Sequence, residues 1–191
     1  MQIKSNTTTK KISFTVQGTR LLEAIKNTDL ALGTSTEPIQ IDSFVTISDP
    51  DLYEFTSGEE ISFQLVKSTT PVYEDLDLDI VACRMYNISK EFNALIVTIP
   101  RPWVDVFDIS PKNVLELPDG SLTIAPVGNK CPITVAENID GGTFTTYVLY
   151  NVIFKSTINV MELTGETESR TFYFAIDPLI KVTSGGSGGK L

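Results

Sequence analysis

The chain has 191 residues, of which 41% are hydrophobic and 20% charged, and it carries a formal net charge of −9. This composition is typical of a folded globular protein and excludes a disordered one. Because the negative charge repels phosphate groups and anionic lipids, we expect neither nucleic acid nor a membrane surface as a partner. No apolar run approaches the roughly 18 residues of a membrane-spanning helix, so we expect no membrane insertion.

The first eleven residues are polar and rich in threonine, and they show no periodic apolar face. We predict that residues 1–11 form a flexible N-terminal arm. Such a segment suits β structure but cannot form a core, so pairing with a strand edge of a neighbouring copy is one hypothesis and simple disorder is the other. The candidate assembly residues in this arm are Thr7, Thr8, Thr9, Lys10 and Lys11.

A strand and a helix are predicted next. Ile12, Phe14 and Val16 alternate with polar residues, which indicates a half-buried strand ended by Gly18. The following sequence, TRLLEAIKNTDLAL, has grouped leucines and isoleucine, with Thr19 as the predicted N-cap. It is the one credible helix in the chain.

Strand patterns recur from Pro38 onward, including the alternation around residues 61–65. Between Asp75 and Ile80, aspartates alternate with leucine or isoleucine, which favours the solvated face of an amphipathic strand. The spacing of the aspartates also suggests a calcium loop, although Ile80 stands where an EF-hand needs glycine. A different calcium site using Asp49 or Asp51 is left open.

The C-terminal half predicts further strands and hairpins. Residues 94–99 read as a strand, and the PDG sequence at 118–120 as the turn of a hairpin. Residues 147–154, YVLYNVIF, are apolar on both faces, which is typical of a strand sandwiched between layers, and we expect this strand to lie centrally. TFYFAI at 171–176 then returns to form a closing hairpin.

Roughly nine to twelve short strands at even spacing predict an all-β fold, namely an antiparallel β-sandwich or jelly-roll-like fold with one short helix near the N-terminus. We expect residues 12–183 to form a single β-sandwich domain, with a sub-division near 100–112 left open. The glycine- and serine-rich sequence at 184–191 is expected to be a flexible linker left by cloning.

The residues needed for common catalytic sites are missing from the sequence. There is no histidine, and no phosphate-binding glycine loop is present. Cys83 and Cys131 lie too far apart in sequence for a zinc motif, and whether they form a disulfide is left open. We therefore expect no enzyme, no cofactor and no metal, with a glycosidase-type carboxylate pair as the one remaining catalytic hypothesis.

Trp103 is the single tryptophan, and Arg101 lies two residues before it. An indole ring beside a guanidinium group can stack on a sugar or on a partner side chain, so both residues are candidates for ligand or partner contact. The competing interpretation is that Trp103 anchors the core or an interface, which is the commoner role of a tryptophan in an apolar neighbourhood.

The sequence YNVIFKSTINV, a turn and then RTFYFAI is similar in its strand–turn–strand rhythm to small β modules of bacterial spore-coat and appendage proteins, and of phage capsid and tail proteins. This resemblance implies a structural class. We therefore expect a non-enzymatic structural protein that self-associates or docks in a surface assembly, with copies of itself or other structural proteins as partners. The outer surface of a spore or virion is the favoured location. The alternative is a carbohydrate-binding or adhesion module that uses Trp103 and loop carboxylates.

Overall fold

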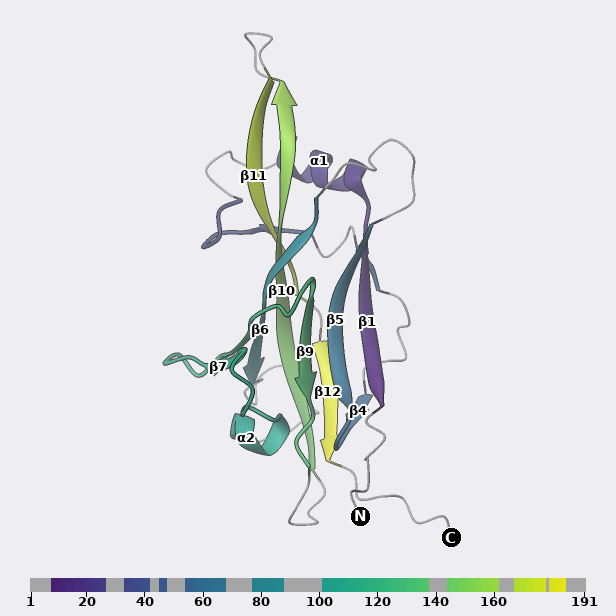
Figure 1. The fold of residues 1–191 in the computed structure, drawn as a ribbon, viewed down its shortest axis with the longest axis vertical. Coiled ribbons are helices and arrows are strands. Elements are labelled where there is room, and N and C mark those ends of the chain that lie inside the picture. The colour runs from purple at the N-terminus through teal and green to yellow at the C-terminus, as the bar shows by residue number, and fades with distance from the viewer. Residues whose placement is uncertain are drawn as a thin grey trace, which may run out of the picture.

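The computed structural model describes residues 8–26, 33–41, 45–47, 54–67, 77–87, 101–137, 144–161, 167–177 and 179–184. Within these ranges the chain is mostly strand, with two helices, so the predicted all-β class is confirmed (Figure 1). The helices are α1 (Gly18–Lys26) and α2 (Trp103–Val106). The strands are β1 (Thr9–Val16), β2 (Ile39–Gln40), β3 (Val45–Ile47), β4 (Glu54–Thr56), β5 (Glu60–Lys67), β6 (Asp79–Asn87), β7 (Val114–Glu116), β8 (Leu122–Ile124), β9 (Lys130–Thr134), β10 (Phe144–Met161), β11 (Thr167–Ile176) and β12 (Leu179–Ser184).

The strands form two sheets. The smaller has the order β3-β1-β5-β9, and the larger runs β2-β11-β10-β6-β8-β7, with β12 also paired to β10 and β4 to β12. Along one edge β10 pairs with β6, and along the other it pairs first with β12 and then with β11. The predicted central position of residues 147–154 in the sheet and the predicted closing hairpin are therefore confirmed. The predicted cover on both faces is wrong, because Leu149, Asn151 and Ile153 are only partly buried.

The predicted antiparallel pairing is wrong at three places. β1 pairs with β5, β2 with β11, and β4 with β12, in each case in parallel. Parallel partners need a long crossing connection, and each of these pairs joins strands that are far apart in the sequence. Turn residues identify only hairpins between neighbouring strands, so the sequence pattern did not reveal these contacts.

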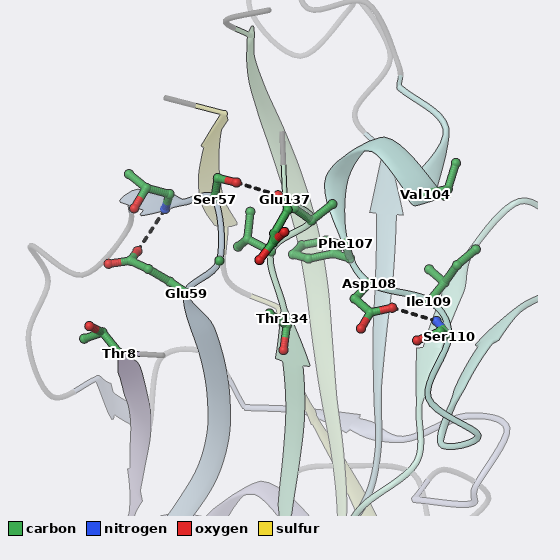
Figure 2. A pocket seen from close by; sticks show the side chains of 14 residues that line it. Thr8, Ser57, Glu59, Val104, Phe107, Asp108, Ile109, Ser110, Thr134 and Glu137 are labelled. Atoms are coloured by element: carbon green, nitrogen blue, oxygen red, sulfur yellow. Dashed lines mark hydrogen bonds between the residues drawn. The ribbon is translucent and has the colours of Figure 1, made fainter. Parts of the chain in front are cut away.

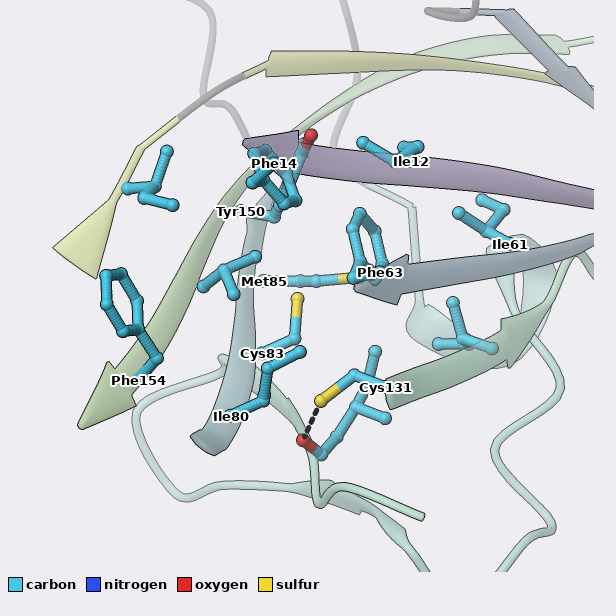
Figure 3. Packing of buried hydrophobic residues seen from close by; sticks show 14 of the residues in the cluster. Ile12, Phe14, Ile61, Phe63, Ile80, Cys83, Met85, Cys131, Tyr150 and Phe154 are labelled. Atoms are coloured by element: carbon cyan, nitrogen blue, oxygen red, sulfur yellow. Dashed lines mark hydrogen bonds between the residues drawn. The ribbon is translucent and has the colours of Figure 1, made fainter. Parts of the chain in front are cut away.

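Side chains from both sheets share one hydrophobic core (Figure 3). Phe14 of β1 and Phe63 of β5 pack against Tyr150 of β10, with ring centroids 6.2 and 4.6 Å apart. Tilted aromatic pairs at such distances add about 0.5–1.5 kcal/mol beyond simple burial. The alternation predicted for β1 is confirmed, because Ile12, Phe14 and Val16 are all buried.

The N-terminal strand begins at Thr9, earlier than the predicted start at Ile12. Thr9, Lys10 and Lys11 lie in parallel register with the start of β5. The backbone of β5 gives these polar residues hydrogen-bond partners, which a search for apolar alternation does not detect. The prediction of an arm up to residue 11 is therefore wrong from Thr9 onward; Thr8 is exposed, and Thr7 lies outside the described residues.

The predicted helix is confirmed as far as Lys26 by α1, which buries Leu21 and Ala24; its predicted continuation over residues 27–32 lies outside the described residues. Thr19 lies inside its first turn and is not the cap; the carbonyl of Gln17 accepts the first backbone hydrogen bonds, at 3.0 and 3.2 Å. The single turn α2 was not predicted. Among the described residues, no helix is long and apolar enough to cross a membrane.

Other local predictions have mixed outcomes. The hairpin at residues 118–120 is confirmed, because β7 and β8 pair antiparallel around Gly120, whose φ is +79°. Ser184 ends β12 and is therefore not part of a linker. Asp77 and Asp79 are exposed while Leu78 and Ile80 are buried, as the amphipathic pattern predicts. The predictions that fall outside the described residues concern Asp49, Asp51, Asp75, the strand at 94–99 and the linker at 185–191.

Candidate functional site

Trp103, the candidate ligand contact, is part of the core. Its side chain is 2% exposed, and its indole Nε1 donates a hydrogen bond of 2.8 Å to the carbonyl oxygen of Gly120. The ring of Phe107 stacks beside it at 6.1 Å. The indole therefore offers no open face on which a sugar could stack. Arg101 is exposed at the start of this segment.

An open pocket of about 830 Å³ lies beside α2 (Figure 2). It brings together the start of β1, the turn between β4 and β5, the segment that follows α2 and the end of β9. Three carboxylates line it, those of Glu59, Asp108 and Glu137. The sequence contains too many acidic residues to select this trio, because only the tertiary fold brings these segments together.

Two of these carboxylates already accept hydrogen bonds from their own chain. Glu59 pairs with Lys10 at 2.8 Å and accepts the backbone N–H of Thr56 at 2.8 Å. Burial alone raises the pKa of Glu59, but these hydrogen bonds and the charge of Lys10 outweigh burial and lower it. The side-chain and backbone hydrogen bonds of Ser110 likewise lower the pKa of Asp108.

This electrostatic setting does not favour acid catalysis. A glycosidase needs one carboxylic acid with a raised pKa, so that it keeps a proton to donate. Glu59 and Asp108 are shifted in the opposite direction, so both are ionised at neutral pH. Within the ranges given above, no cluster of three or more His, Cys, Asp or Glu residues is arranged to hold a metal ion.

Both cysteines are buried between the sheets as free thiols (Figure 3). Cys83 lies on β6 and Cys131 on β9, where the Sγ of Cys131 contacts the carbonyl oxygen of Ile124 at 3.5 Å. Burial raises the pKa of Cys83 well above its usual value and that of Cys131 to about 12. Thiols held protonated in this way are poor nucleophiles.

The end of the β10–β11 hairpin extends past the strands that flank it in the described part of the sheet. β6 pairs with β10 only as far as Lys155, and β2 pairs with β11 only at Phe174 and Ala175. Residues 156–161 and 167–172, which we name the distal ribbon, continue past both neighbours. Figure 1 shows this ribbon projecting beyond α1 and the smaller sheet.

The two faces of the distal ribbon differ. On one face Ile158 and Phe172 are buried and anchor the ribbon to the core. On the other, the hydroxyls of Thr157 and Thr171 lie 3.0 Å apart, and Ser169 donates a 2.6 Å hydrogen bond to Asn159. These cross-strand contacts hold the two strands in register.

The outer edge of β11 exposes backbone hydrogen-bonding groups. The backbone N–H of Tyr173 donates a hydrogen bond of 2.9 Å to the carbonyl oxygen of Gly33. The backbone hydrogen-bonding groups of Tyr173 therefore point away from β10. Along a strand, the backbone N–H and C=O groups of successive residues point alternately to its two edges. Those of Thr167, Ser169 and Thr171 therefore point to the same outer edge as those of Tyr173. Within the part of the chain that the structure describes, these three have no strand partner on that side. Such an edge is a template for another strand.

The other described sheet edges are shorter or carry residues that oppose pairing. The longest of them is the outer edge of β1, where β3 covers only Phe14–Val16, so Thr9–Ser13 have no strand partner on that side among the described residues. β9 carries Lys130 and Pro132, two residues that natural proteins use to prevent edge pairing. β2, β3, β4 and β7 are only two or three residues long. The distal ribbon is therefore the most extensive edge in the described ranges that proline does not block. The sequence predicted its hairpin but not its projection.

Comparisons with known proteins do not show a family. No family model matches the chain, and no curated protein matches it. Among solved structures, the chain is similar to the inclusion body protein PixA from Burkholderia cenocepacia J2315, with a TM-score of 0.49 and 9% sequence identity over 97% of this chain and 99% of that one. A likeness of this size carries no argument about function.

Proposed function

We propose that this chain is a non-enzymatic structural protein that acts by self-association, as a subunit of a surface assembly such as a coat, an appendage or a virion. The observation that carries the proposal is the distal ribbon, where Thr167, Ser169 and Thr171 on the outer edge of β11 have no strand partner among the described residues. Strand addition at such an edge supplies affinity through main-chain hydrogen bonds.

The side chains of the edge also suit this role. The residues that point outward are small and uncharged, and threonine favours strand geometry. The net charge of −9 limits indiscriminate aggregation, so that association depends on a specific contact. For the fold, we propose a β-sandwich in which the two sheets face each other; the packing of Phe14 and Phe63 on Tyr150 supports it.

The test is the oligomeric state of the whole chain. Sedimentation velocity over a hundredfold range of concentration, followed by negative-stain imaging, should show oligomers that grow with concentration. A single monomeric species at every concentration would overturn the proposal. So would turnover of a substrate by the pure protein.

A second candidate function rests on the pocket. Its carboxylates and hydroxyls are groups that bind the hydroxyls of a carbohydrate, and Glu137 is exposed at its edge. Binding on a glycan array that is lost in Glu137→Gln would support this alternative. Glu116→Gln, an exposed change on β7, is the matched control, and absence of binding by the wild type would eliminate the alternative.

A further inference from the structure

We infer that the partner at the β11 edge is a second copy of the same chain, paired antiparallel about a two-fold axis that passes through Ser169. This inference rests on the proposed self-association and specifies its contact. It requires backbone groups that match, side chains that are compatible and an edge that a second molecule can reach.

The backbone groups match in this arrangement. A two-fold axis at Ser169 places this residue opposite Ser169 of the second copy, and Thr167 opposite Thr171 of the second copy. The backbone N–H and C=O groups of these residues all point to the outer edge of β11, as the hydrogen bond from Tyr173 to Gly33 indicates. Each facing pair therefore occupies a hydrogen-bonded position, where the two residues exchange both N–H···O bonds.

The charges select this register. Glu168 and Arg170 flank Ser169, so the axis places Glu168 opposite Arg170 of the second copy and Arg170 opposite Glu168. These are the non-hydrogen-bonded positions, at which side chains come closest. Within one chain Arg170 already pairs with Glu168, at 2.8 Å from Nε and 2.7 Å from Nη2. In the dimer each Arg170 therefore lies beside the Glu168 of its own chain and opposite the Glu168 of the second copy, and each Glu168 is placed in the same way between two arginines.

Other registers lose this match. With the axis at Thr171, Arg170 faces Phe172 of the second copy. With the axis at Glu168 or at Arg170, that charged residue faces its own copy. Like charges directly opposite each other destabilise paired strands, so the two alternatives centred on charged residues are disfavoured. The Ser169 register is the one that satisfies both the backbone and the charges.

No described strand covers this edge. The distal ribbon extends past the strands that flank it on either side, so a second copy that pairs there displaces none of the described strands (Figure 1). A two-fold contact of this kind is isologous and closes as a dimer. Past Lys155 the other edge of β10 has no strand partner among the described residues, which offers a second site for growth of a larger assembly.

Charge reversal tests the register directly. In Glu168→Arg the arginines of one copy face the arginines of the other, and in Arg170→Glu the glutamates face each other. Each variant alone should therefore raise the dimer dissociation constant by more than about tenfold, because like charges at an interface are costly. Mixing the two variants places arginine opposite glutamate at every position and should restore dimers. The double variant Glu168→Arg/Arg170→Glu should dimerise with itself.

Glu116→Arg, which makes the same charge change on exposed β7, is the matched control and should dimerise like the wild type. Thermal unfolding of each variant verifies that it is folded, and damage to the fold is not repaired by mixing. If the wild type associates and both reversals still associate, the β11 register is wrong while self-association stands. If the wild type stays monomeric, both proposals fail.

Discussion

The indole of Trp103 acts in folding and not on the surface. Its ring is buried and its N–H is bound to Gly120. Trp103→Ala should therefore lower the free energy of unfolding by about 3–5 kcal/mol, the usual loss for a buried tryptophan. Val104→Ala, at a side chain 60% exposed, should change it by less than about 0.5 kcal/mol. Urea unfolding followed by circular dichroism measures both, and equal stabilities would contradict this assignment.

The two thiols should be chemically silent in the native protein. Burial raises the pKa of Cys131 to about 12 and that of Cys83 well above its usual value, so the thiolate that reacts is nearly absent at pH 8. A colorimetric disulfide reagent should label neither cysteine before unfolding and both in strong denaturant. Rapid labelling of either cysteine in the folded protein would show that the sheets open at this point.

At the scale of the element, β10 has one face in the core and one that is only partly covered. Phe154 is fully buried, whereas Ile153 on the opposite face is half-buried. Phe154→Ala should cost about 3–5 kcal/mol, and Ile153→Ala less than about 2 kcal/mol. Asp77→Ala, at an exposed position, is the near-neutral control. Chemical denaturation ranks the three variants, and a larger loss at Ile153 would reverse the assignment of faces.

At the scale of the whole molecule, the shared core predicts cooperative unfolding. Trp103 and Phe107 belong to the same buried cluster as Phe14 and Tyr150, so α2 and both sheets should unfold together. Tryptophan fluorescence and far-ultraviolet circular dichroism should then give the same midpoint in urea. Two separate transitions would indicate a sub-division of the chain near residues 100–112.

Local pattern was sufficient for the hairpins and for the faces of the strands. Alternation in residues 12–16 identified the buried face of β1, and the PDG turn identified the β7–β8 hairpin. Both features arise from residues adjacent in the chain, where the period of two and the turn geometry act directly. The same reasoning missed the pairing of Thr9–Lys11, because the hydrogen bonds there come from β5.

The sequence by itself therefore determined the all-β class, the presence of a helix near the N-terminus and the burial of alternate side chains, since each depends on local periodicity and turn chemistry. Only the tertiary structure decided which distant strands pair in parallel and that Trp103 lies in the core. It also decided that Glu59, Asp108 and Glu137 line one pocket and that, among the described strands, none pairs with β11 at residues 167–171. These features depend on contacts between segments that are distant in the sequence. Such contacts produce no local hydrophobic period or turn motif from which they could be predicted.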